Sequence, residues 1–124
     1  MDSNEIIEIN ESKILEMINE LPQKNIIILK FTANWCGPCK KIHSTCENFL
    51  KSIPESIKYY EIDIDESIEL YMKLKKNKMV NGIPALLAYY PVKKEKWFIP
   101  DDSHLGSDIS GLQNFFNRCL EYVK

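Results

Sequence analysis

The feature that most limits how this chain can fold is an apolar run that leads directly into two closely spaced cysteines. Residues 26–31 are almost all apolar, which is typical of a strand covered on both faces by helices. Cys36 and Cys39 follow shortly after this run, and a helix is expected to continue from them to about Leu50. The chain therefore places two thiols between a buried strand and the start of a helix.

Size and composition predict one domain that spans residues 1–124. The chain has 124 residues, 44% of them hydrophobic, which is enough for a core without disulfide staples. It has too few cysteines for a secreted disulfide framework, its first residues do not resemble a signal peptide, and no apolar stretch is long enough to span a membrane. We therefore expect a cytoplasmic protein, in which a Cys-x-x-Cys pair is more often catalytic or metal-binding than structural. The net charge of −2 argues against nucleic acid as a partner.

Strand and helix patterns alternate along the chain. An amphipathic helix is expected before the apolar run, ending at Pro22. The other expected elements are a short first strand at residues 5–9, strands at 57–64, 85–90 and 96–99, helices at 68–78 and from 109 onward, and a polar turn at 100–107. This order predicts an α/β fold with a central mixed sheet of four to five strands and helices on both faces.

Two thiols at the first turn of a helix are suited to disulfide exchange, which needs one thiolate that attacks and a second thiol that resolves the mixed disulfide. Cys36 would lie where backbone N–H groups and the helix dipole favour negative charge. Cys39, three residues later, would lie on nearly the same helix face. Gly37 would allow the loop to approach closely, and Pro38 fits an early helical position that needs no N–H donor.

Two short runs carry a family signature. The first consists of Phe31, Thr32, Ala33, Asn34, Trp35, Cys36, Gly37, Pro38, Cys39 and Lys40. The second consists of Val80, Asn81, Gly82, Ile83, Pro84 and Ala85. Together with the order of elements over roughly residues 10–122, these runs resemble the active-site segment and the cis-proline loop of the thioredoxin family. The resemblance implies a thioredoxin fold.

The resemblance also implies a protein-disulfide reductase. Cys36 would be the exposed nucleophile and Cys39 the resolving thiol, while Trp35 would shelter the disulfide and contact the partner protein. The bond between Ile83 and Pro84 would be cis and would leave the Ile83 backbone free to pair with a substrate chain, whereas an ordinary trans turn is the alternative. The implied partners are disulfide-containing proteins and NADPH-dependent thioredoxin reductase, and the protein itself would be a monomer without cofactor or metal.

The chain departs from the family pattern at its buried charges. The family usually has a buried Asp six residues before the nucleophile and a lysine on the next strand, whereas this chain has Lys30 and Glu61. Because one member of a buried pair left alone is a costly charge, we expect Lys30 and Glu61 to contact each other beneath Cys39. Glu61 or a water molecule would then relay the proton of Cys39. The alternative is that Lys30 extends to solvent.

Other departures concern the active-site helix and the substrate groove. Ser44 replaces a proline that commonly kinks this helix in the family, so a straighter helix is expected. Residues 91–105 are longer than the family's hairpin, and Gly106 is the best match for the glycine that borders the substrate groove. Gly37 and Pro38 are expected to contact the substrate as well.

Several further side chains have two interpretations. His43 is one helical turn after Cys39 and is either a proton carrier or half-buried packing. Cys46 and Cys119 lie on apolar helix stripes and are expected to be small buried hydrophobes, with a regulatory disulfide as the alternative. Residues 101–103 lack the ligand spacing of a calcium loop and are expected to be a solvated acidic loop.

Three rival functions fit parts of the sequence. Cys36, Cys39, His43 and Cys46 resemble a zinc ligand set, but they extend over roughly 15 Å of helix, whereas zinc ligands lie only about 2 Å from the ion. A non-catalytic thioredoxin-fold adaptor would not need the intact cysteine pair. A secretory oxidant or isomerase usually has a histidine between the cysteines and an export signal, whereas this chain has Gly37 and Pro38 and no such signal. The family resemblance associates Gly-Pro with a reducing potential, which also disfavours a glutaredoxin. Disulfide reduction is therefore the expected function, with the adaptor as the alternative.

Overall fold

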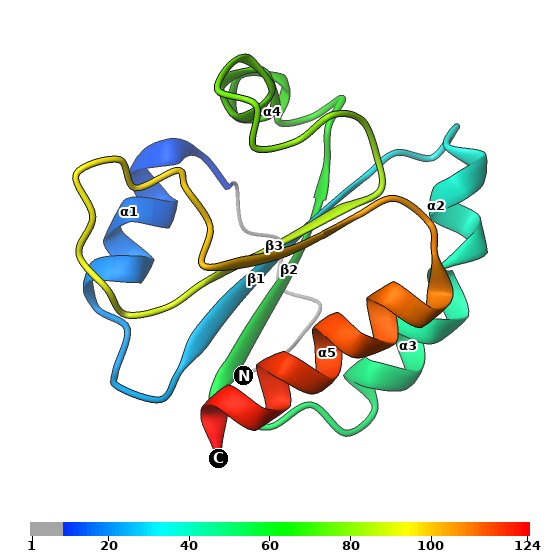
Figure 1. The fold of residues 1–124 in the computed structure, drawn as a ribbon. Coiled ribbons are helices and arrows are strands. Elements are labelled where there is room, and N and C mark those ends of the chain that lie inside the picture. The colour runs from blue at the N-terminus through cyan, green and yellow to red at the C-terminus, as the bar shows by residue number, and fades with distance from the viewer. Residues whose placement is uncertain (1–8) are drawn as a thin grey trace.

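The computed structural model describes residues 9–124, and its strands form one mixed sheet (Figure 1). The strands are β1 (Ile26–Thr32), β2 (Ile57–Asp63), β3 (Ala85–Tyr89) and β4 (Asp102–Leu105). They lie in the order β2-β1-β3-β4, with β1 parallel to β2, β3 antiparallel to β1, and β4 antiparallel to β3. The mixed α/β sheet that the sequence predicts is confirmed.

Helices cover both faces of this sheet (Figure 1). One face packs against α1 (Glu11–Asn19) and α4 (Ile68–Lys76). The other face packs against α3 (His43–Leu50) and α5 (Ile109–Val123), and the short α2 (Gly37–Lys41) precedes α3 on that side. No helix within residues 9–124 has the length and apolar character needed to cross a membrane.

The central strand β1 supplies both hydrophobic clusters. Ile27, Leu29 and Phe31 enter the cluster with α1 and α4, whereas Ile26 and Ile28 enter the cluster with α3 and α5. All five side chains are fully buried. Successive side chains of a strand point to opposite faces, so a continuous apolar run is what a strand between two helical layers requires.

The prediction of a straight helix after the cysteines is wrong, because the helix is interrupted at Ile42. This residue has φ −94° and ψ 0°, ends α2 and precedes α3, although no proline follows it. Ile42 is fully buried in the cluster with α5, whereas Cys39 packs in the cluster with α1 and α4. The interruption lets neighbouring turns of the chain pack against both clusters.

The expected strand at 96–99 and the expected turn at 100–107 are wrong. The strand β4 begins at Asp102, and residues 90–101 form an irregular segment instead. Trp97 and Phe98, whose apolar character suggested a strand, pack against the cluster of α1 from this segment. Asp102 accepts two hydrogen bonds from Arg118 of α5, so this part of the acidic loop is not simply solvated.

Two other expectations concern the first helix and the chain start. The helix α1 ends at Asn19, before the expected end at Pro22. The short strand expected at residues 5–9 falls, except for Ile9, outside the described residues. Ile9 itself is buried and precedes α1.

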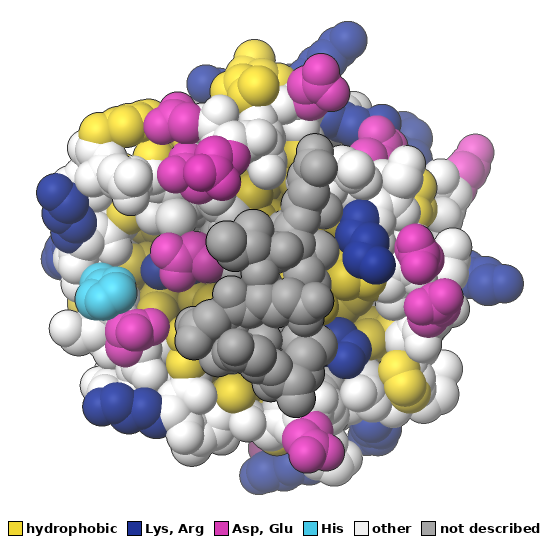
Figure 2. All heavy atoms as spheres, turned by 180° about the vertical axis from the view of Figure 1, so that it is seen from behind, with side chains coloured by type: hydrophobic (Ala, Val, Ile, Leu, Met, Phe, Trp, Pro, Cys, Tyr) yellow, Lys and Arg dark blue, Asp and Glu magenta, His cyan; other side chains and the backbone are white. Residues whose placement is uncertain are grey.

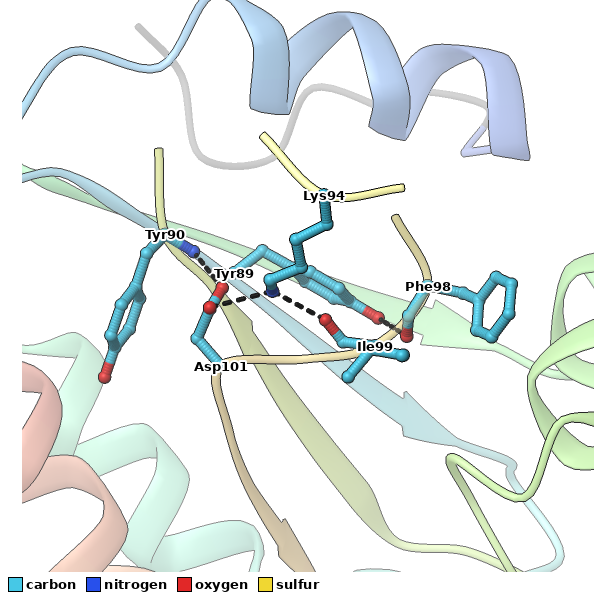
Figure 3. A network of polar contacts seen from close by, with 6 residues as sticks. All are labelled: Tyr89, Tyr90, Lys94, Phe98, Ile99 and Asp101. Carbon is cyan, nitrogen blue, oxygen red and sulfur yellow. Dashed lines mark hydrogen bonds and ion pairs between the residues drawn. The ribbon is translucent and has the colours of Figure 1, made fainter. Parts of the chain in front are cut away.

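Asp101 fastens the irregular segment to the end of β3 (Figure 3). Its carboxylate accepts a hydrogen bond from the Tyr90 backbone N–H at 2.8 Å and pairs with the Lys94 ammonium at 2.8 Å. The Tyr89 hydroxyl donates to the Phe98 carbonyl at 2.9 Å. These contacts satisfy polar groups of the segment without strand pairing, as buried backbone groups require.

The irregular segment is also joined to α1 and α4. The Glu11 carboxylate accepts a hydrogen bond from the Trp97 indole N–H at 2.8 Å and pairs with the Lys73 ammonium at 2.7 Å. Lys73 and Trp97 together hold the pKa of Glu11 below its usual value. The ion pair is half-exposed and contributes little by itself, so its main effect is to orient Trp97.

We expect Asp101→Ala to lower the free energy of unfolding by about 1–3 kcal/mol, because the Tyr90 N–H loses its acceptor and Lys94 its counter-charge. Urea denaturation measures this change. Asp101→Asn keeps a hydrogen-bond acceptor, so its free energy of unfolding should lie between those of the parent protein and Asp101→Ala. The matched control is Glu95→Ala in the same segment, where an exposed side chain should change stability by no more than about 0.5 kcal/mol. Equal stability of Asp101→Ala and the parent protein would show that this carboxylate does not anchor the segment.

Candidate active site

Cys36 and Cys39 lie where the chain leaves β1 and enters α2. They are joined by a disulfide bond. Cys36 is the N-cap residue of α2, and its sulfur accepts a hydrogen bond from the Cys39 backbone N–H at 3.1 Å. Pro38 occupies the first turn, where a missing N–H costs nothing. An N–H group at a helix start stabilises negative charge on the atom it faces, so the local geometry favours a thiolate on Cys36 once the bond is reduced.

Cys36 is less exposed than the resemblance implies. Only 4% of Cys36 and 5% of Cys39 is accessible to solvent. The Cys36 sulfur is bonded to Cys39 and lies 3.8 Å from the Ile83 carbonyl oxygen. The expectation of an exposed Cys36 is therefore wrong for the disulfide-bonded form, because the bond and the proline loop cover the sulfur.

The proline loop and the end of β4 meet beside the cysteine pair. The Ile83–Pro84 peptide bond is cis, as expected, and the trans alternative is excluded. The Gly106 N–H donates to the Pro84 carbonyl at 2.9 Å, which joins the loop to the residue after β4. Gly106 has φ +98°, a conformation that favours glycine, and a Cβ there would meet no atom within 4 Å. The Ile83–Pro84 loop thus lies beside Cys36, and Gly106 lies beside Pro84.

Trp35 projects beside Cys36, with 66% of its surface exposed. Its indole N–H donates to the Asp65 carboxylate at 2.9 Å. No local sequence pattern marks Asp65 as a site residue. The signal that identifies it is topological, because β1 and β2 are parallel with Thr32 opposite Asp63, so the loops after both strands leave at one edge of the sheet.

Gly37 faces open space in the structure. A Cβ at Gly37 would meet no atom within 4 Å. Close approach of the loop therefore does not demand glycine at this position, and that expectation is wrong. The open space beside Gly37 lies next to Cys36, at the surface that a partner must approach.

Lys30 and Glu61 lie opposite each other on β1 and β2. The Lys30 ammonium is 3.8 Å from the Glu61 carboxylate, so the expected contact is present. Lys30 is only 2% exposed, which excludes the alternative that its side chain extends to solvent. The Glu61 side chain is 53% exposed. The ion pair therefore has a buried positive end and a hydrated negative end.

A cavity of about 340 Å³ brings these charges together with the resolving cysteine. Its lining includes Lys30, Cys39, His43 and Glu61. His43 is exposed rather than half-buried, so the packing interpretation is wrong for this residue. Cys39 and the half-exposed Glu61 carboxylate therefore border the same cavity.

Cys46 and Cys119 are buried free thiols, as expected. Burial raises the pKa of Cys46, while the Lys30 charge and the Tyr59 hydroxyl act in the opposite direction. Burial raises the pKa of Cys119 to about 12. Both thiols are therefore protonated at neutral pH and pack as small apolar groups.

The geometry agrees with comparisons to known proteins. The sequence model of the Thioredoxin family matches residues 5–105. The chain belongs to the thioredoxin family. It is 32% identical to thioredoxin-1 of Saccharomyces cerevisiae over 74 residues, and the matched segment covers 60% of this chain and 67% of the yeast protein. It is 26% identical over 119 residues to thioredoxin 3 of Plasmodium falciparum, which covers 95% of this chain and 62% of that protein.

Solved thioredoxins have the same fold. The X-ray structure of Fasciola hepatica thioredoxin matches with a TM-score of 0.66 at 25% identity, covering 86% of this chain and 91% of that one. The family membership and the disulfide-bonded cysteine pair make this chain a thiol–disulfide oxidoreductase of the protein-disulfide reductase kind. The curated relatives are matched over about two thirds of their own length, so particular substrates and partners are proposals.

The four cysteines should differ sharply in reactivity after gentle reduction. Iodoacetamide near neutral pH is expected to label Cys36 at least about tenfold faster than Cys46 or Cys119, because alkylation requires a thiolate that the reagent can reach. Mass spectrometry of the tryptic peptides measures each site. In denaturant, Cys46 and Cys119 should label readily. Native labelling of either thiol at the rate of Cys36 would contradict the burial described here.

Proposed function

We propose that this protein reduces disulfide bonds in other proteins, with Cys36 as the nucleophile and Cys39 as the resolving thiol. The observation that carries this assignment is the hydrogen bond from the Cys39 N–H to the Cys36 sulfur, because it stabilises negative charge on Cys36 and not on Cys39. The Cys36 thiolate attacks one sulfur of the substrate disulfide. Cys39 then attacks the Cys36 sulfur, which releases the reduced substrate and leaves the Cys36–Cys39 disulfide.

The substrate chain lies in extended form beside the proline loop. Its backbone pairs with Ile83, in the way that peptides add a strand to an exposed edge. The exposed indole of Trp35, held by Asp65, packs against the partner. The positive φ and the open space at Gly106 support its place at the border of the groove. The full set of substrate contacts is Trp35, Gly37, Pro38, Ile83, Pro84 and Gly106.

Glu61 is the acceptor for the proton that Cys39 loses during resolution. The Glu61 carboxylate and Cys39 line the same cavity, and the carboxylate is half in solvent. A water molecule in this cavity connects the thiol to the carboxylate. Proton transfer by this route lets a buried thiol react without direct contact with bulk water.

The cellular setting that we propose follows the family. NADPH-dependent thioredoxin reductase returns two electrons to the Cys36–Cys39 disulfide, in the cytoplasm, and the protein acts as a monomeric single domain over residues 1–124 without a cofactor of its own. The face seen in Figure 2 has basic and acidic side chains interspersed, which supports protein partners over nucleic acid. A non-catalytic adaptor would need neither the joined cysteines nor the cavity beside Cys39.

Reduction of insulin by dithiothreitol, followed by turbidity, tests the assignment of the two thiols. Cys36→Ser should abolish catalysis, because no other thiol starts the exchange. Cys39→Ser should retain attack but stop at a mixed disulfide with the partner, visible on a non-reducing gel. The control is Cys119→Ala, which removes a buried thiol far from the chemistry and should keep most of the activity. Full activity of Cys36→Ser would overturn the proposed function.

Glu61→Gln tests the proton route. The resolution rate is measured by stopped-flow absorbance, as Cys39 displaces 2-nitro-5-thiobenzoate from a mixed disulfide on Cys36. We expect this rate to fall about tenfold or more near neutral pH, because the thiol loses its proton acceptor. Glu55→Gln, on an exposed side chain before β2, is the matched control. A resolution rate equal to that of the parent protein would remove Glu61 from the mechanism.

A further inference from the structure

Lys30 is a charged residue in the protein interior, where loss of hydration destabilises a charge. It is the one buried polar or charged residue among residues 9–124, with 2% of its surface exposed. Its ion-pair partner Glu61 is 3.8 Å away and half-exposed, so the pairing is long and partly hydrated. A lone buried ammonium costs several kcal/mol, by order of magnitude, unless close partners compensate for it. The geometry of the ion pair alone therefore gives no stability reason for a lysine here.

The surroundings of Lys30 show which thiols lie within reach of its charge. Lys30 lies near the Cys46 thiol, and its charge opposes the rise that burial causes in the pKa of Cys46. On the other side, Lys30 and Cys39 line the same cavity. The sulfur of Cys39 is the one that must become a thiolate during resolution, and unlike Cys36 it does not receive the hydrogen bond at the start of α2.

We propose that the buried Lys30 ammonium stabilises the thiolate that forms on Cys39 when the mixed disulfide is resolved. This inference rests on the proposed function, in which Cys39 is the resolving thiol. The charge is set in the centre of the sheet on β1, so it needs no rearrangement to act.

Lys30 forms and breaks no bond in the resolving step. Cys39 gives its proton through water to Glu61. The Cys39 thiolate then forms a bond to the Cys36 sulfur, the bond between Cys36 and the substrate sulfur breaks, and its electron pair leaves on the substrate. The Cys39 sulfur is oxidised to the disulfide level, the Cys36 sulfur stays at that level, and the substrate sulfur is reduced to a thiolate that takes a proton from solvent.

The other charged groups around Cys39 act more weakly than Lys30. Lys40 of α2, His43 of α3 and Glu61 of β2 also line the cavity, and all three are exposed. Exposed charges are screened by water and salt, whereas a buried charge acts through a lower effective dielectric. The buried positive charge therefore dominates the field at the Cys39 sulfur, and the negative charge of Glu61 opposes it only in part.

Lys30→Met separates an electrostatic role from a structural one. Methionine has a similar length and no charge, and the Glu61 carboxylate that it leaves without a partner is half-exposed and stays hydrated, so the folded state should not lose stability. If Lys30 has a structural role, the Lys30→Met protein should lose stability and function together. If Lys30 acts through its charge, the variant should keep its stability and lose only the effect on Cys39.

The experiment uses the full chain with Cys36→Ser and follows iodoacetamide labelling of Cys39 against pH by peptide mass spectrometry. We expect Lys30→Met to move the midpoint of this curve upward by at least about one pH unit, and Lys30→Arg to restore it. Lys58→Met, on an exposed lysine of β2, is the matched control and should leave the midpoint in place. Urea denaturation should show that Lys30→Met is as stable as the parent protein or more so.

Two results would overturn this inference. One is an unshifted midpoint in a folded Lys30→Met protein. The other is a shift accompanied by loss of stability that Lys30→Arg does not restore, since that pattern belongs to a packing defect. Failure of the proposed function is distinguishable, because it appears as insulin reduction by Cys36→Ser, whereas the labelling curve reads the Cys39 thiol directly.

Discussion

Burial of β1 on both faces is the constraint on which the rest of the structure depends. Its side chains alternate between the cluster with α1 and α4 and the cluster with α3 and α5, and it pairs with β2 on one edge and β3 on the other. A strand held in this way has no freedom to shift its register, because a one-residue slip would exchange its two faces. The end of β1 is therefore a rigid point from which reactive groups can be placed.

The active site gathers at that end from segments far apart in the chain. The start of α2 supplies the cysteine pair, and the loop after β2 supplies the carboxylate that holds Trp35. The Ile83–Pro84 loop precedes β3 and Gly106 follows β4, and the two meet at one end of this antiparallel pair. The two sulfurs meet different environments. Cys36 faces a backbone N–H at a helix start, whereas Cys39 faces a cavity with a buried ammonium and a half-hydrated carboxylate. In the mechanism that we propose, attack and resolution therefore draw on different sources of electrostatic stabilisation.

Much of the fold was predictable because its elements have strong local patterns. The apolar run of β1 and the apolar stripe of α5 correspond to the observed elements within one or two residues. The strand expected at 96–99 failed because Trp97 and Phe98 bury themselves from a loop, with Asp101 and Glu11 satisfying the polar groups around them. Apolar residues with strand propensity predict burial. Whether they form a strand depends on whether another backbone segment lies beside them for hydrogen bonding.

The amino-acid sequence by itself determined the chemistry of this protein, because the two thiols, the proline that follows Gly37 and the helix that begins there are local features within a few residues. The resemblance to the thioredoxin family, which the sequence carries, also indicated the pairing of Lys30 with Glu61. Only the tertiary structure decided that the Lys30 charge is buried while that of Glu61 is hydrated, that Asp65 holds Trp35, and that the disulfide-bonded Cys36 is covered by the proline loop. The physical reason is that burial and charge environment depend on contacts between segments distant in the chain, which no local pattern specifies.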